Sequence, residues 1–322
     1  MRRIATTVLA FLFMGLGHAV VGQTYPAKPI RIVVPFPAGG IADLFSRHIG
    51  QKLNETWGQP VVVDNRTGAG GNIGSEIVAK SPPDGYTLVM GSIGTHSVNV
   101  SLFSKLPYDP LRDFAPVALV MEAEGLLVLH PSVPVKSVKE LVALARARPG
   151  QVAYASAGHG TASHLAGELF KSMAKVDMVH VPYKGNVPAI TDLIGGQTSL
   201  LFATMPTVLP QVQAGRLKAL AVTSSARSPA APELPTIAEA ALPGYSVTNW
   251  IGLFAPAGTP RDIVVKLNGE TVRIMQAPDI QKRLTLEGAK FTPTTPDSFT
   301  AFVKSEIAKW AKVVKEAGIR VD

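Results

Sequence analysis

From residue 30 onward, the sequence alternates short apolar segments with glycine-rich turns and helical segments. The run at 30–35 is typical of a strand buried on both faces, and a glycine turn and a helix over about 43–55 follow it. Further strands are predicted at 61–64 and 86–90, with a glycine turn and a short helix between them. Repeated units of this kind predict an α/β fold in which helices cover both faces of a parallel sheet.

Two longer apolar segments, 114–130 and 250–256, interrupt this alternation and read as strands that cross from one part of the molecule to another. They predict two lobes, each a sheet flanked by helices, with residues 25–123 and 249–322 in lobe 1 and residues 124–248 in lobe 2. A cleft between lobes is a usual place for a small ligand. The remaining predicted strands are 151–155, 178–181, 200–203 and 217–223, and the remaining predicted helices are 137–148, 161–173, 187–193, 261–275, 279–286 and 296–317.

The first 22 residues have the features of a secretory signal peptide. Arg2 and Arg3 precede an apolar stretch at 4–16, and small residues follow it. The apolar stretch is shorter than the ~20 residues that span a bilayer. The sequence therefore predicts a product that is soluble outside the cytoplasm, in the periplasm. Cleavage would lower the net charge from +8 to +6 by removing these two arginines.

Composition excludes several classes of protein. The chain has no cysteine, so disulfides, thiolate catalysis and cysteine metal sites are ruled out. Lys and Arg are scattered and only 7% of residues are aromatic, whereas nucleic-acid binding needs a clustered basic patch. No nucleic-acid partner is therefore predicted.

The first candidate binding site is the glycine turn at 35–43, between the first strand and the first helix. Glycines let a backbone approach a ligand closely, and the helix N-terminus that follows suits a carboxylate. Asp43 could either cap this helix or contact a ligand, and the sequence leaves both roles open. The predicted ligand-binding residues in this turn are Phe36, Ala38, Gly39, Gly40, Ile41, Ala42 and Asp43.

The second candidate site, at 156–164, repeats the order of strand, glycine turn and helix start. If the two turns face each other across a cleft, each could hold one end of a dicarboxylate. For Thr161 and Ser163, simple helix capping is an equal alternative. The predicted ligand-binding residues here are Ser156, Gly158, His159, Gly160, Thr161 and Ser163, and Ser92 and Ala203 complete the set.

Neither a cofactor, a metal nor an enzymatic activity is predicted. Glycines at 68–74 miss the dinucleotide spacing because Ile73 stands where glycine is needed, so they read as a turn. His159 and His164 lack the spacing of a zinc pair, and His180 reads as isolated. Ser156 has alanine on both sides, unlike the nucleophile of a hydrolase.

Seven segments of the chain resemble the Bug family, the substrate receptors of tripartite tricarboxylate transporters. Together they cover nearly the whole chain after the signal peptide, in order, and several are long. The matching runs are YPAKPIRIVVPFPAGG (25–40), GQPVVVDNRTGAGGNIGSEIVAKSPPDGYTL (58–88), LPYDPLRDFAPVALV (106–120), SHLAGELFKSMA (163–174), VHVPYKG (179–185), LKALAVTSSARSP (217–229) and LFAPAGTP (253–260).

The resemblance implies a two-lobed periplasmic binding protein of the Venus-flytrap, type II-like class. It implies a receptor, expected to be a monomer, that binds a small carboxylate through the backbone N–H groups and small hydroxyls of the two turns. It also implies delivery of the solute to the membrane subunits of a tripartite tricarboxylate-type transporter. A receptor that reports its solute to a membrane signalling partner is the alternative function.

The sequence departs from the usual family pattern at three positions that face the predicted cleft. Where relatives often have PGGGTD, this chain has AGGIAD, so Ile41 replaces a glycine and Ala42 a threonine. Ala203 stands where relatives often have an aspartate that would suit an amino group. These differences favour a ligand with an apolar or aromatic body and one or two carboxylates. The crossing segments near Val120 and Trp250 are the predicted hinges.

Overall fold

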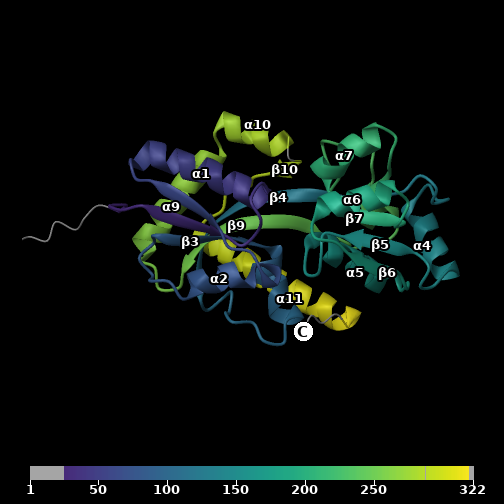
Figure 1. Ribbon diagram of the computed structural model, residues 1–322, viewed down its shortest axis with the longest axis horizontal. Helices are drawn as coiled ribbons and strands as arrows, with labels where there is room; N and C mark the ends of the chain where they lie inside the picture. The colour runs from purple at the N-terminus through teal and green to yellow at the C-terminus, as the bar shows by residue number, and fades with distance from the viewer. Residues whose placement is uncertain (1–24, 287, 319–322) are drawn as a thin grey trace, which may run out of the picture.

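The computed structural model describes residues 25–286 and 288–318, so the predicted signal peptide at 1–22 lies outside the described residues. The molecule is elongated, with two α/β lobes side by side (Figure 1). Among the described residues, no helix has the length and apolar character needed to cross a membrane.

The first lobe, on the left in Figure 1, holds a sheet in which β1 pairs in parallel with β2 and β3. Its helices pack on both faces of this sheet, as the repeated strand–helix pattern predicts. The elements of this lobe are β1 (Ile30–Val34), α1 (Ile41–Trp57), β2 (Val61–Asn65), the short helix η1 (Ala69–Gly71), α2 (Asn72–Ala79), β3 (Thr87–Ser92), η2 (Gly94–Val98), α3 (Asn99–Leu102), α9 (Arg261–Met275), α10 (Pro278–Leu286), β10 (Ala289–Lys290) and α11 (Pro296–Ala317).

The second lobe has a parallel arrangement of three strands, in which β5 lies between β6 and β7. Helices again cover the sheet, and α4 lies at the far end of the molecule (Figure 1). The elements of this lobe are α4 (Val138–Ala147), β5 (Ala153–Ser156), α5 (Ala162–Ala174), β6 (Val179–Pro182), α6 (Asn186–Ile194), β7 (Leu200–Thr204), α7 (Met205–Gln213), β8 (Lys218–Val222) and α8 (Ile237–Ala240).

Two long strands, β4 (Phe114–Leu129) and β9 (Thr248–Pro256), connect the lobes as the sequence predicts. The first part of β4, through Glu124, pairs with β9, and the part from Gly125 onward pairs with β7 and β8. Because the chain crosses once in each direction, β4 and β9 are antiparallel, and the sheet is mixed rather than fully parallel. In strand order, β9 lies between β3 and β4, and the sheet continues through β4 to the strands of the second lobe.

Helix α11 packs apolar side chains into the core. Phe299, Val303 and Trp310 have no exposed surface. Both indole N–H groups of Trp250 and Trp310 donate to one carboxylate oxygen of Glu306, over 3.1 and 3.0 Å. A buried carboxylate is costly unless it is hydrogen-bonded. Because Trp250 belongs to β9 and Glu306 to α11, the Trp250 bond also fixes α11 against β9.

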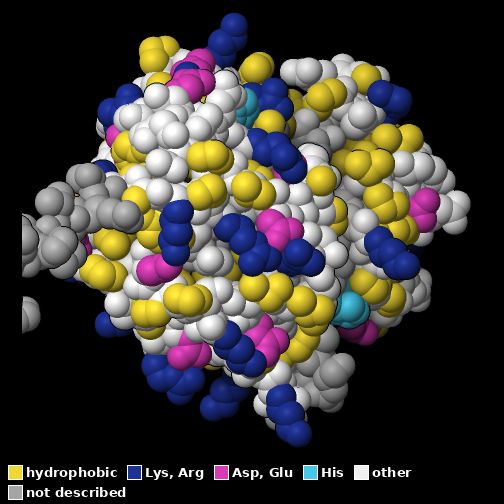
Figure 2. Space-filling model, turned by 60° about the vertical axis from the view of Figure 1, so that its left-hand side comes forward, with side chains coloured by type: hydrophobic (Ala, Val, Ile, Leu, Met, Phe, Trp, Pro, Cys, Tyr) yellow, Lys and Arg dark blue, Asp and Glu magenta, His cyan; other side chains and the backbone are white. Residues whose placement is uncertain are grey.

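On one face of the molecule, charged side chains of both signs are mixed (Figure 2). On the face shown in Figure 2, Lys and Arg side chains lie among acidic and hydrophobic ones and do not form one continuous basic patch.

Candidate ligand-binding cleft

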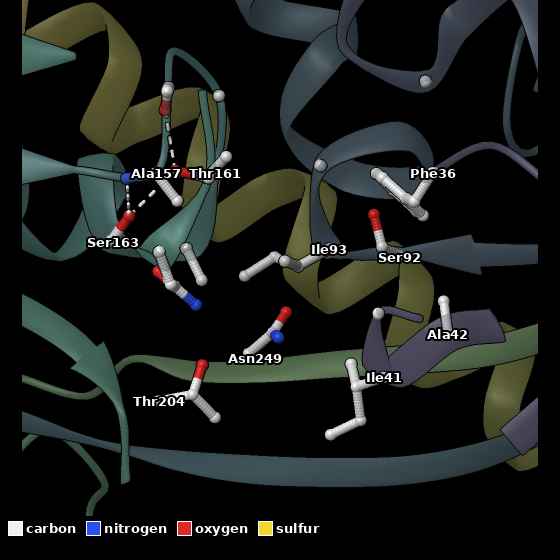
Figure 3. A pocket seen from close by; sticks show the side chains of 18 of the residues that line it. Phe36, Ile41, Ala42, Ser92, Ile93, Ala157, Thr161, Ser163, Thr204 and Asn249 are labelled. Carbon is white, nitrogen blue, oxygen red and sulfur yellow. Dashed lines mark hydrogen bonds between the residues drawn. The ribbon is translucent and has the colours of Figure 1, made fainter. Parts of the chain in front are cut away.

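A cavity of about 910 Å³ lies between the two lobes. The loops that line it follow the carboxyl ends of β1, β2 and β3 in one lobe and of β5, β6 and β7 in the other. Asn249 of β9 also lines the cavity (Figure 3). The rest of the lining comes from Ile251 of β9, the 123–125 segment of β4, Ala166, Thr223 and Val247. The carboxyl ends of parallel strands are the usual ligand site of open α/β sheets.

The first loop presents the start of α1 to this cavity without any side-chain cap. The N-cap is Gly40, in extended conformation at φ −76° and ψ 168°, and the first intrahelical hydrogen bond runs from Leu44 N–H to Gly40 O over 2.9 Å. The N–H groups of Ile41 and Ala42 precede that bond, and both residues line the cavity. A helix start of this kind carries roughly half a positive charge and attracts anions.

Asp43 braces the first loop and does not line the cavity. Its carboxylate accepts from the Gly39 N–H over 2.9 Å and from two nitrogens of Arg47 over 3.0 and 2.9 Å. The hydrogen bonds from Arg47, with that of the Gly39 N–H, hold the pKa of Asp43 below its usual value despite its burial. Of the two roles that the sequence left open, the geometry supports a structural one in the first helical turn.

The second loop uses its polar side chains internally. Thr161 is the N-cap of α5: its hydroxyl accepts from the His164 N–H over 3.4 Å and donates to Gly158 O over 2.7 Å. The Ser163 hydroxyl lies 2.9 Å from that of Thr161 and accepts from the Ala157 N–H over 2.8 Å (Figure 3). The capping alternative is therefore realised for Thr161, and Ser163 supports the same turn.

Eleven of the fifteen predicted ligand-binding residues line the cavity, and four do not. Ala38 and Gly39 lie on the solvent side of the first loop, and Asp43 is engaged by Arg47. Ser156 is fully buried behind the second loop, where its hydroxyl lies 2.6 Å from His180 Nε2. The lining residues are Phe36, Gly40, Ile41, Ala42, Ser92, Gly158, His159, Gly160, Thr161, Ser163 and Ala203.

The prediction that His180 is isolated is wrong. Its ring stacks on that of His164 with 4.2 Å between centroids, and the ring of His159 meets it edge-on at 5.0 Å. Burial, with the neighbouring histidines, lowers the pKa of His164 to about 4 and that of His180 to about 3. Sequence spacing missed this cluster because His180 comes from a different strand, which pairs with β5.

Several lining residues were not predicted. The glycine turn at 68–71, interpreted as a simple turn, lines the cavity, as do Thr204 and Asn249. Lys184 and Gly185 also line it, just before α6, whose start has no side-chain cap. Their position after a strand was the available signal, since every strand of the parallel arrangement ends at this cleft.

The chain matches the model of the tripartite tricarboxylate transporter family receptor over residues 45–319. A similar solved structure is an R. palustris protein with adipate, which is 39% identical, covers 92% of this chain and 100% of its own, and has a TM-score of 0.83. The periplasmic binding protein BugD is 35% identical, with 92% and 100% coverage and a TM-score of 0.80.

A third structure is MatC from Rhodopseudomonas palustris with bound malate, at 38% identity, 90% and 100% coverage and a TM-score of 0.80. The family model and these structures are of solute-binding receptors, not of enzymes. Together with the two-lobed fold and its cleft, they establish that this chain belongs to the tripartite tricarboxylate transporter receptor family.

Proposed function

We propose that this protein is a periplasmic receptor for a small carboxylate that it delivers to the membrane subunits of a tripartite tricarboxylate-type transporter. The observation that carries the proposal is the start of α1, which has no side-chain cap and whose residues Gly40, Ile41 and Ala42 line the cleft. Such a site binds a carboxylate without a cationic side chain. The signal-like sequence at 1–22 supports export and cleavage. We expect the protein to be a monomer in solution.

We propose that the solute is a dicarboxylate with an apolar body. One carboxylate would lie at the start of α1 in the first lobe, and the other near Lys184 and the uncapped start of α6 in the second. Phe36, Ile41 and Ala203 also line the cavity and offer apolar surface to the body of the solute. The adipate and malate of the related structures are consistent with this class.

Amino acids are the main alternative to a dicarboxylate with an apolar body, because they carry a carboxylate and an amino group. Ala203 provides no carboxylate for an amino group, but Glu124 of β4 also lines the cavity and could pair with one. We expect Ile41 and Ala203 to favour an apolar chain over a zwitterion, because an amino group against these side chains would lose its hydration.

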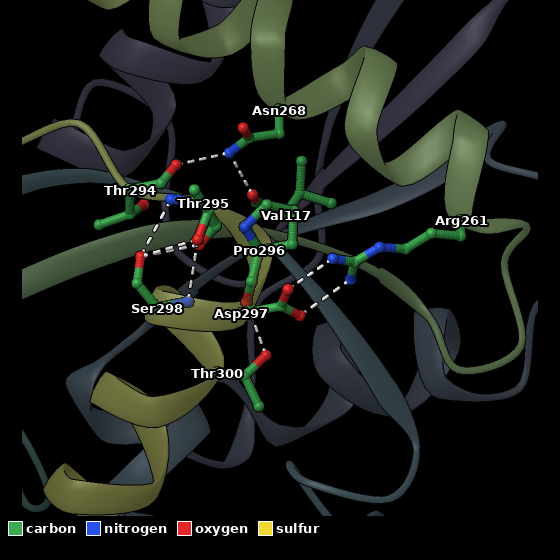
Figure 4. Close-up of polar contacts among 9 residues, drawn as sticks. All are labelled: Val117, Arg261, Asn268, Thr294, Thr295, Pro296, Asp297, Ser298 and Thr300. Carbon is green, nitrogen blue, oxygen red and sulfur yellow. Dashed lines mark hydrogen bonds and ion pairs between the residues drawn. The ribbon is translucent and has the colours of Figure 1, made fainter.

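Closure of the lobes would complete the site. We place lobe 1 at 25–123 plus 249–322 and lobe 2 at 124–248, with hinges near Val120 and Trp250. Just before the first hinge, Val117 O accepts from the Asn268 side chain over 2.8 Å, and the same amide donates to Thr294 O over 2.8 Å (Figure 4). These bonds fix β4 to α9 and to the segment that precedes α11, so bending is expected beyond them.

Calorimetry on the mature protein tests the proposal with adipate, its monoacid hexanoate, its diamide, glutamate and benzoate. We expect adipate to bind more tightly than hexanoate, and the diamide not to bind. Lys184→Met should weaken adipate binding about fivefold and hexanoate binding little, since a partly exposed ion pair contributes up to about 1 kcal/mol. Lys139→Met, an exposed lysine of α4, is the matched control.

Two outcomes would contradict the proposal. Equal affinity for adipate and its diamide would show that the cleft does not recognise an anion. Tight binding of glutamate, with none of adipate or benzoate, would overturn the apolar class of solute while keeping the carboxylate receptor.

A further inference from the structure

Three histidines meet beside the second loop, in a cluster that carboxylate binding does not require. His159 comes from the loop itself, His164 from the first turn of α5, and His180 from β6. One ring nitrogen of each lies within 4.8 Å of the others. Two of the three, His164 and His180, do not line the cleft, whereas His159 does.

Two of these imidazoles are held in place by stacking. The ring of His180 lies between those of Tyr154 and His164, with centroids 4.8 and 4.2 Å away and interplanar angles of 18° and 21°. The Tyr154 hydroxyl donates to Glu168, which also pairs with Lys171 over 2.9 Å. Ser156 Oγ lies 2.6 Å from His180 Nε2. A partner at one ring nitrogen fixes an imidazole so that the other nitrogen can act as a ligand.

The third imidazole, that of His159, lies beside the other two at the surface. His159 is exposed, and its ring meets the other two nearly edge-on, at 5.4 and 5.0 Å between centroids. Gly158 and Gly160 flank it at φ +123° and +73°, in the region that glycine adopts easily. Tetrahedral ligands at ~2.1 Å from a metal lie ~3.4 Å apart, so the three nitrogens, which lie within 4.8 Å of one another, must draw closer to reach ligand spacing.

The chemistry of the donors selects the kind of ion. Each of the three imidazoles offers one ring nitrogen as a ligand atom. Neutral imidazoles suit zinc, copper and nickel, whereas magnesium and calcium require oxygen ligands.

We propose that His159, His164 and His180 form a binding site for one divalent ion of the late first-row transition metals, which His159 closes. Because His159 also lines the cleft, a further coordination position would face the cavity. Metal binding would break one hydrogen bond, in which the Gly160 N–H donates to His164 Nδ1 over 3.2 Å. If Nδ1 binds the metal, it can no longer accept this bond. If Nε2 binds the metal, Nδ1 carries the proton and cannot accept it either. The 158–161 loop should therefore move when the metal binds.

Calorimetry on the mature protein, free of any polyhistidine tag and treated with a chelator, tests the site with Zn²⁺, Ni²⁺ and Cu²⁺ alone. The buffer contains no carboxylate, so the result does not depend on the proposed function. We expect one ion per chain at micromolar affinity or tighter. His159→Gln and His180→Gln should each weaken binding about tenfold or more, because even outer-sphere partners of a metal commonly contribute that much.

The exposed position of His159 makes its variant the deciding one, since it should fold even if a change at the buried His164 does not. His48→Gln, on α1 and away from the cluster, is the matched control and should bind as the parent does. Electron paramagnetic resonance of the Cu²⁺ complex should show fewer coordinated nitrogens in His159→Gln. Absence of one-to-one binding for all three ions, or an equal loss in His48→Gln, would overturn the proposal.

Discussion

The two loops that face each other across the cleft have the same order of strand, glycine turn and helix, but their helices begin differently. At the start of α1 the N-cap is Gly40, which has no side chain to accept from the helix. At the start of α5 the N-cap is Thr161, whose hydroxyl accepts from a helix N–H, with Ser163 supporting the turn. Hydroxyl groups in such a loop thus indicate that the first N–H groups of the helix already donate to a side chain. Where the loop has no hydroxyl group, those N–H groups are free to bind a ligand.

Transferring the cap from one loop to the other should have the largest effect. In Gly40→Asp, the new carboxylate would accept from the N–H groups at the start of α1 and repel an anionic solute. The backbone at φ −76° suits aspartate, and a Cβ at this position lies 3.5 Å from its nearest neighbour, Pro37 O. We expect adipate affinity to fall about 100-fold, as loss of hydrogen bonds to a charged group implies, with the melting temperature unchanged or raised.

Gly40→Ala and Gly40→Asn separate the causes of that loss. Gly40→Ala adds a Cβ without a cap and should bind adipate nearly as the parent does. Gly40→Asn caps the helix without a charge, so its adipate affinity should lie between those of Gly40→Ala and Gly40→Asp. Unchanged affinity in Gly40→Asp would show that the solute does not use the start of α1.

Removing a single donor should have a smaller effect. Proline is tolerated at the first position of a helix, so Ile41→Pro should fold while deleting one N–H that faces the cleft. We expect calorimetry to show about a tenfold loss of affinity, equal to roughly 1.4 kcal/mol. Ile41→Ala keeps the N–H and reports the contribution of the apolar side chain alone. If Ile41→Ala lowers the affinity as much as Ile41→Pro does, the N–H does not contact the ligand.

The second loop should respond in stability rather than in binding. Thr161→Ala removes the cap of α5 and should lower the free energy of unfolding by about 1 kcal/mol, as measured by urea titration. Carboxylate affinity should change less than threefold, and Thr161→Ser should restore the stability. A large loss of affinity with little loss of stability would reverse the roles assigned to the two loops.

The smallest difference concerns mild acid. The pKa of His180 is lowered from 6.5 to about 3, so below pH 6.5 the unfolded chain takes up a proton before the folded chain does. The folded state therefore becomes less stable as the pH is lowered. Between pH 7 and pH 6 the loss that His180 contributes is at most about 0.7 kcal/mol, reduced further where solvent reaches the ring. His180→Gln should remove this contribution and leave those of His96 and His164, whose pKa values are also lowered, to about 3 and about 4, when unfolding is measured in the presence of a chelator.

The first loop should not share this sensitivity. The pKa of Asp43 is lowered from 3.8, so its contribution to stability is fully present above that value and disappears only as pH falls below it. Asp43→Asn should leave the slope between pH 7 and pH 6 unchanged. A shallower slope in this variant would mean that the two loops are coupled.

Much of this architecture was predictable because periodic apolar segments report burial directly. The crossing strands, the terminal helices and both loops lie where the sequence predicts them. Helix α7 was missed because of Pro206 and Pro210, although proline is compatible with a helix start, where Pro206 lies. The antiparallel pairings of β4 were missed as well, because strand direction follows from the path of the whole chain rather than from any local pattern.

The candidate site was less predictable, since side-chain orientation depends on partners distant in sequence. Asp43 turns away from the cleft toward Arg47, one helical turn later, and Ser156 is directed to His180. Position after a strand was a reliable sign of proximity to the cleft, as Lys184 and the 68–71 turn show, but it did not indicate which groups were already bonded.

The position of β9 between β3 and β4 sets the order in which the molecule can be assembled. As the polypeptide emerges in sequence order, β3 and β4 are made long before Thr248–Pro256, the segment that must fill the gap between them. Until then each has an edge without its neighbour, and unpaired edges invite aggregation. A chain that ends before residue 248 should thus fail to form its first lobe, and the complete chain would reach its final form only after nearly all of it has been delivered to the compartment where it folds.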